Sequence, residues 1–177
     1  MPPASLREQV IVVYDAMRDA GLSRAYYEDR LEWWKRINLT IEIVLALTAS
    51  ATGIGSWAVW QSGSGVSAWA AISAATAALA IVKPFLAADR QIANYAALSS
   101  EYAALFHSFK SLATQIKIRH AVSEEMLAAF FKSEGEFKRL AQKDGAQPNA
   151  RVVARLQDVV NRQIPAESLW LPSENGP

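Results

Sequence analysis

The feature that most constrains this chain is a long apolar segment, residues 43–82, that contains no Asp, Glu, Lys, Arg or His. The polar sequence QSGSG at residues 61–65 divides the segment into two arms. As a helix rising about 1.5 Å per residue, an arm of about 17 residues nearly spans the roughly 30 Å hydrocarbon core of a bilayer. A membrane hairpin requires two such charge-free arms, whereas a soluble protein has little use for them. The segment therefore predicts a membrane helical hairpin over residues 37–86, with spans at residues 37–60 and 66–83.

The charged residues lie in the flanks of this segment, and the loop between the arms carries none. Lys35, Arg36, Lys83 and Arg90 all lie at the ends of the arms remote from the loop. By the positive-inside rule, both termini are expected in the cytoplasm and the hairpin in a bacterial inner membrane. Two tryptophan groups, expected as aromatic belts, mark the opposite ends of the arms: Trp33 and Trp34, and Trp57, Trp60 and Trp69. A hairpin buried in a soluble bundle remains the alternative.

Residues 1–36 are predicted to form helices on the cytosolic side. Apolar residues recur there at helical spacing: Leu6, Val10, Val13, Met17 and Ala20. Gly21 is expected to interrupt this helix, and Ser23 to cap a second helix that continues into the first arm.

Residues 87–165 are predicted to form a cytosolic helical region that begins after a kink at Lys83-Pro84. A coiled-coil-like seam runs through it at spacings of three and four: Tyr95, Leu98, Tyr102, Leu105, Phe109, Leu112 and Ile116. The seam is expected to pack within the chain or to form a subunit interface. The sequence thus indicates an all-α fold, a membrane helical hairpin extended by a cytosolic helical bundle.

Two further helices are expected near the C-terminus. The first begins at Ser123, with acidic residues in its first turn, and a turn at residues 145–148 follows it. The second ends at Ile164-Pro165. The tail, residues 166–177, is expected to be extended, with Trp170 docked on the bundle.

Small and hydroxylic residues gather on one face of each arm. Each of these faces also carries one charged residue: the first has Glu42 with Ala49, Thr52 and Ser56, and the second has Lys83 with Ser73, Thr76 and Ala80. Small and hydroxylic residues allow close packing and interhelical hydrogen bonds, and they also suit a water-lined pore face in an oligomer. At about 1.5 Å per residue, Glu42 and Lys83 lie at nearly equal distances from the loop, which predicts an ion pair between them.

The sequence contains no motif for catalysis or cofactor binding. Cysteine is absent, and the two histidines, His107 and His120, are isolated from other metal ligands. A net charge of +1 argues against a nucleic-acid binder. We therefore expect no enzyme activity, no cofactor and no metal.

The segment YYEDRLEWWKR (residues 26–36), the apolar hairpin and the segment ADR (residues 88–90), which opens a long aromatic-containing helix, together resemble SLATT domains over residues 5–145. These are two-transmembrane bacterial proteins associated with nucleotide second-messenger synthetases. The resemblance implies an oligomeric, pore-forming or membrane-perturbing effector of an anti-phage system, without catalytic residues. Its partners would be the lipid bilayer, further copies of itself and a nucleotide synthetase or sensor acting in trans. A passive membrane-anchored scaffold is the alternative.

Overall fold

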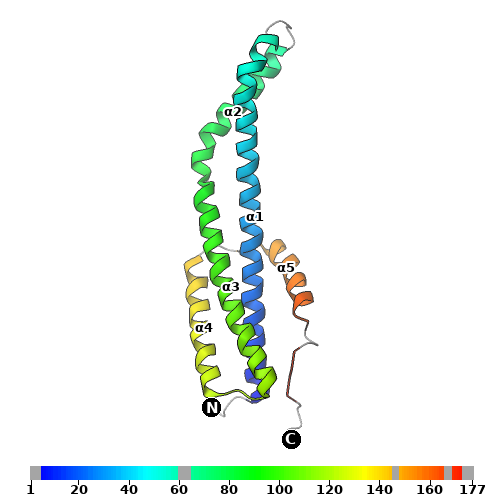
Figure 1. Ribbon diagram of the computed structural model, residues 1–177, viewed down its shortest axis with the longest axis vertical. Coiled ribbons are helices and arrows are strands. Elements are labelled where there is room, and N and C mark those ends of the chain that lie inside the picture. Colours follow the sequence, from blue (N-terminus) through cyan, green and yellow to red (C-terminus); the bar gives the residue numbers. More distant parts are fainter. Residues whose placement is uncertain (1–4, 60–64, 145–147, 166–168, 173–177) are drawn as a thin grey trace. The chain divides into compact units, whose positions relative to one another are not determined.

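The computed structural model describes residues 5–59, 65–144, 148–165 and 169–172, although the side chains of residues 49–70, 72–73 and 84–85 lie outside the description. The predicted all-α class is confirmed, because the described residues contain five helices and no strand (Figure 1). The helices are α1 (Leu6–Val59), α2 (Gly65–Leu86), α3 (Ala88–Arg119), α4 (Glu124–Asp144) and α5 (Ala150–Gln163).

The chain divides into two compact units. Residues 1–29 and 96–177 form the first, which we call the bundle unit, and residues 30–95 form the second, the hairpin unit. The bundle unit contains the start of α1, most of α3, and α4 and α5. The hairpin unit contains the rest of α1, α2 and the start of α3.

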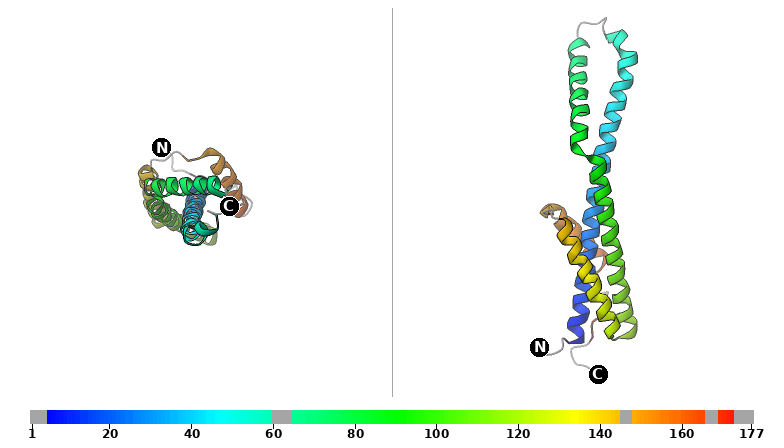
Figure 2. Two further views of the ribbon diagram at one scale, coloured as in Figure 1. Left: turned by 90° about the horizontal axis from the view of Figure 1, so that it is seen from above. Right: turned by 90° about the vertical axis from the view of Figure 1, so that its left-hand side faces the viewer.

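The bundle unit has a well-defined apolar core. α4 lies along α3 (Figure 2), where the Phe109 and Phe130 rings are 5.8 Å apart and the Tyr102 and Phe137 rings 5.5 Å apart. The core takes from α1 the buried Val10, Val13, Tyr14, Met17, Ala20 and Tyr27, and from the later helices Met126, Leu140, Leu156 and Val160. Each fully buried Val, Leu, Ile, Phe or Met side chain stabilises the fold by about 1.5–3 kcal/mol relative to an exposed one.

The heptad seam of α3 lies in this core. Leu98, Tyr102, Leu105, Phe109, Leu112 and Ile116 are all buried within the single chain. Tyr95 belongs to the hairpin unit and is half-buried. The seam therefore packs within the chain, which is the first of the two alternatives raised by the sequence.

The predicted helix break at Gly21 is wrong, and so is the predicted cap at Ser23. α1 runs without interruption from Leu6 to Val59, and Gly21 is a buried residue inside it. A Cβ atom at Gly21 would lie 3.3 Å from the Phe106 ring, so glycine allows this ring to approach the helix closely. The propensity cost of glycine, about 1 kcal/mol, is smaller than the gain from packing the turns on either side.

The break predicted at Lys83-Pro84 falls slightly later in the chain. α2 continues through Pro84 to Leu86, and α3 begins at Ala88. Between them, Ala87 has a φ of 44°, in the left-handed region that a non-glycine residue adopts at a cost of about 1 kcal/mol or more. The Ala87 carbonyl accepts a hydrogen bond from the Gln91 N–H at 3.0 Å, which starts the new helix.

The predicted start of α4 and the predicted end of α5 are confirmed. The Ser123 hydroxyl accepts a hydrogen bond from the Met126 N–H at 3.3 Å, so Ser123 caps α4. Asn149 caps α5 by accepting from the N–H groups of Arg151 and Val152, and Ile164 ends that helix. Residues 145–147 of the predicted turn lie outside the described residues.

The C-terminal segment docks on the bundle unit through Trp170, as predicted. The backbone N–H of Trp170 donates a hydrogen bond to the Tyr14 hydroxyl at 3.2 Å. The indole stacks on His120, with ring centroids 4.9 Å apart and planes 20° apart. Residues 166–168 and 173–177 of the tail lie outside the described residues.

Candidate functional site

The hairpin unit exposes several of its large aliphatic side chains. Leu39, Ile43 and Leu47 of α1 are 57%, 50% and 65% exposed, and Ile81 and Val82 of α2 are 66% and 45% exposed. Among the described side chains of this unit, Ala88 alone is buried. The two helices therefore have no apolar core of their own in the part that the structure describes. Large aliphatic side chains that are exposed together are typical of interaction surfaces.

Aromatic and charged side chains meet at the end of the hairpin unit remote from the loop. The Arg30 guanidinium lies 4.8 Å from the centroid of the Trp33 ring, a cation–π contact. Trp33 and Trp34 make an edge-to-face contact at 5.1 Å, and Lys35 pairs with Glu32 at 3.0 Å. This end has the amphipathic chemistry of an aromatic belt, although its depth in a bilayer stays a prediction.

The ion pair predicted between Glu42 and Lys83 is present. The Lys83 Nζ and Glu42 Oε1 atoms are 3.6 Å apart, so the pair joins α1 to α2. The amide of Asn38 donates a hydrogen bond to the same Glu42 Oε1 atom at 3.0 Å. With both side chains partly exposed, such a pair contributes about 0–1 kcal/mol in water.

The other members of the two small-residue faces are only partly described. Thr76 is half-buried and Ala80 is exposed. The side chains of Ala49, Thr52, Ser56 and Ser73 lie outside the described residues. Whether these faces pack helices or line a pore therefore stays a prediction.

A polar stripe on α1 was not singled out by the sequence. Arg30, Trp34, Asn38 and Glu42 follow one another at intervals of four residues and so share one helix face. Arg30 Nε, Trp34 Nε1 and Asn38 Oδ1 are buried atoms that have no hydrogen-bond partner among the described residues. Buried polar atoms of this kind are usually satisfied by water, so this face is suited to hydration. The four-residue spacing is the signal that reveals it.

No described helix combines the length and the apolar composition that a bilayer span requires. No group of His, Cys, Asp and Glu side chains among the described residues could hold a metal ion.

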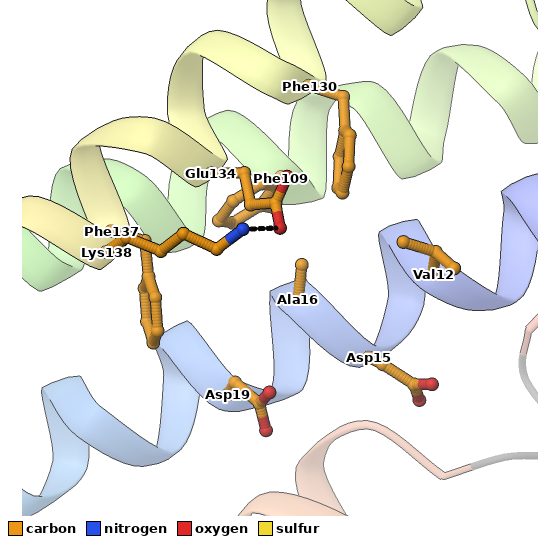
Figure 3. A pocket seen from close by; sticks show the side chains of 9 residues that line it. All are labelled: Val12, Asp15, Ala16, Asp19, Phe109, Phe130, Glu134, Phe137 and Lys138. Carbon is orange, nitrogen blue, oxygen red and sulfur yellow. Dashed lines mark ion pairs between the residues drawn. The ribbon is translucent and has the colours of Figure 1, made fainter. Parts of the chain in front are cut away.

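The bundle unit contains a second candidate site, a pocket of about 310 Å³ lined by α1, α3 and α4 (Figure 3). We call it the acid–aromatic pocket. Its lining consists of Val12, Asp15, Ala16, Asp19, Phe109, Phe130, Glu134, Phe137 and Lys138. Three phenyl rings form one wall, and ionisable side chains lie at its rim.

The charges of the acid–aromatic pocket are unbalanced. Glu134 and Lys138 form an ion pair at 2.6 Å, one helical turn apart on α4. On α1, burial and then the neighbouring charge of Asp15 raise the pKa of Asp19 above its ordinary value. The sequence does not predict this pocket, because the pocket requires residues that are more than 100 positions apart in the chain.

No protein-family model matches the sequence, and neither a curated protein nor a solved structure is significantly similar to it.

Proposed function

We propose that this chain is a bacterial membrane protein whose hairpin unit inserts into the cytoplasmic membrane and whose oligomers perturb that membrane or form pores in it. The observation that carries the proposal is the outward orientation of Leu39, Ile43, Leu47, Ile81 and Val82 on two helices that have no apolar core in their described part. Lipid is the solvent in which such a surface is stable, because each buried apolar Å² contributes about 25 cal/mol.

The length of the charge-free segment supports the same proposal. Residues 43–82 contain no ionisable side chain, and the proposal includes residues 49–70, whose side chains lie outside the described residues. On insertion scales, Leu, Ile, Phe and Val contribute about −0.3 to −0.6 kcal/mol each at the centre of a span. The second arm has few of these residues, so we propose that it inserts together with the first as the return leg of a hairpin.

The cations at the ends of the arms support a definite orientation. Lys35, Arg36, Lys83 and Arg90 flank the arms, and residues 61–65 between the arms carry no charge. The positive-inside rule then assigns the bundle unit and both termini to the cytoplasm. Partners that switch the protein on would act there.

The effector role rests on the resemblance to SLATT domains and on the arms themselves. Small and hydroxylic side chains such as Thr52 and Thr76 favour close helix contacts between copies. In this proposal the activating signal comes from a nucleotide synthetase or sensor that acts in trans, and the response is depolarisation of the infected cell.

A pair of matched substitutions tests insertion. Leu47 and Ile118 are both highly exposed, at 65% and 74%, but Leu47 lies in the hairpin unit and Ile118 in the bundle unit. An arginine inside a membrane span costs up to about 3 kcal/mol, whereas one on a water-exposed surface costs little. Leu47→Arg should therefore move the protein from the carbonate-resistant membrane fraction to the soluble or degraded fraction, and Ile118→Arg should not. Equal fractionation of the two variants would contradict insertion.

A membrane-anchored scaffold is a second candidate function, favoured by the apolar side chains that the bundle unit exposes. Phe131 is 62% exposed and Ile118 is 74% exposed. A scaffold would use such side chains to recruit a cytosolic partner without changing the membrane. Expression in bacteria loaded with a potential-sensitive dye separates the two functions, because an activated effector depolarises the cells and a scaffold does not.

A further inference from the structure

We propose that the acid–aromatic pocket of the bundle unit binds a small organic cation, a protonated amine on an aliphatic or aromatic body. This inference goes beyond the proposed function and does not depend on membrane insertion. It rests on the size of the pocket, on its phenyl wall and on its uncompensated carboxylates.

The size and the wall of the pocket fix the class of ligand. A volume of about 310 Å³ lies at the lower end of the range for small-molecule sites, roughly 300–1,000 Å³. Phe109, Phe130 and Phe137 form the apolar wall, and the short side chain of Ala16 leaves the space open on the α1 side (Figure 3). Aromatic faces attract cations, and they also accommodate a methylene chain or a second ring.

The carboxylates fix the sign of the charge. Asp15 and Asp19 lie one turn apart on α1, and neither makes a hydrogen bond or an ion pair with any residue that the structure describes. Like charges at this spacing repel each other, so a cation at this rim would relieve the repulsion. The lining carries three carboxylates and one ammonium group, which disfavours an anionic ligand.

Lys138 already places one ammonium group in this pocket. Its Nζ lies at the α4 rim, held by Glu134 at 2.6 Å, opposite the α1 rim that carries Asp15 and Asp19 (Figure 3). The α4 rim is therefore already neutralised by the chain itself. The α1 rim is not, and the ammonium group of the ligand would bind there while its apolar body contacts the phenyl rings.

The binding test uses the full chain, solubilised in a neutral detergent, and two probes of equal shape. 2-Phenylethylammonium carries the charge, and 2-phenylethanol is its neutral counterpart. With the phenylalanines labelled by fluorine, the cation should produce saturable ¹⁹F shifts, and the alcohol should bind about tenfold more weakly or not at all. The same shifts at the same concentrations for both probes would overturn the proposal.

Two substitutions locate the site on the protein. Asp19→Asn should weaken binding of the cation about tenfold, and Asp158→Asn, which removes an exposed carboxylate of α5, should leave it unchanged. Ala16→Leu should block binding by filling the pocket, whereas Ala128→Leu at an exposed position of α4 should not.

Circular dichroism melting accompanies each variant, so that a loss of binding is interpreted only for a folded chain. If Ala16→Leu unfolds the protein, Asp19→Asn alone decides the question, because it changes charge and leaves the volume almost unchanged. Binding that survives Asp19→Asn with its original affinity would overturn the proposal. Depolarisation plays no part in this test, so its failure and the failure of the proposed function are separate results.

Discussion

Two helical glycines differ in what surrounds them, and this difference predicts their substitution energies. Gly135 of α4 has no atom within 4 Å of an added Cβ, so Gly135→Ala should stabilise the fold by about 0.5–1 kcal/mol through helix propensity alone. At Gly21 the same gain is opposed, because the Phe106 ring lies 3.3 Å from the new atom and must move. Urea unfolding should show a smaller or reversed effect for Gly21→Ala.

Substitution by leucine should enlarge the difference in unfolding free energy between variants at Gly21 and at Gly135. Overpacking typically costs about 1–3 kcal/mol, so Gly21→Leu should be clearly destabilising and Gly135→Leu should not. Equal unfolding midpoints for the two leucine variants would mean that Phe106 does not pack against Gly21.

Asp19 predicts a pH-dependent stability difference. Its pKa in the folded chain is raised above the ordinary value of 3.8, so the folded state binds the proton more tightly than the unfolded state does. The charged form therefore costs stability above the folded pKa, and this cost disappears as the pH falls through that pKa towards 3.8. Asp19→Asn should stabilise the fold at pH 7, by less than about 1 kcal/mol because the carboxylate is partly exposed.

The gain should vanish near pH 3, where wild-type Asp19 is protonated. Thermal melts of the variant and of Asp158→Asn at both pH values check this. A gain that is the same at pH 3 and pH 7 would show that the substitution acts through something other than charge.

At the scale of helices, the sequence predicted those boundaries that local chemistry decides. Ser123 caps α4 because its hydroxyl reaches a free N–H group three residues later, and this requires no distant contact. The helix break predicted at Gly21 is wrong because this glycine serves the close approach of the Phe106 ring, and Phe106 lies more than 80 positions away in the chain. Propensity alone favoured a break there, and tertiary packing overrode it.

The two candidate sites differ in the same way. Glu42 and Lys83 could be paired from the rise of a helix, because a hairpin maps sequence distance onto depth. The acid–aromatic pocket could not be predicted, since Asp19, Phe109 and Glu134 come from three different helices. Only the packing of α1, α3 and α4 brings such residues together.

The Glu42–Lys83 pair predicts a charge-swap rescue. Glu42→Lys places two ammonium groups at the junction between α1 and α2, and should lower stability or function. Combining it with Lys83→Glu restores opposite charges and should recover much of the loss. The yield of detergent-extracted protein and the depolarisation assay both report this. If the double variant is no better than Glu42→Lys, the pair does not contribute to packing of the hairpin. Altered ion selectivity in Glu42→Gln would show that Glu42 lines a pore.

At the scale of the whole molecule, the proposed function predicts one topology. Reporters fused before Met1 and after Pro177 should both give cytoplasmic signals. A cysteine at Ser64, in a chain that has none of its own, should react with a membrane-impermeant maleimide in intact spheroplasts. A cysteine at Ser100 of α3 is the matched control and should react only after lysis. Labelling of both positions, or of neither, in intact spheroplasts would contradict the hairpin.

The bundle unit is interrupted in sequence, because residues 30–95 lie between its two parts. Its contacts join the start of the chain to its end, as in the Tyr14–Trp170 and Arg18–Ile164 hydrogen bonds, which span 156 and 146 positions. A ribosome adds roughly 5–20 residues per second, so the apolar segment is complete about 4–18 seconds before Trp170, 88 positions later, is made. Under the proposed function, this order of synthesis gives the segment time to meet a membrane before the bundle unit can finish folding.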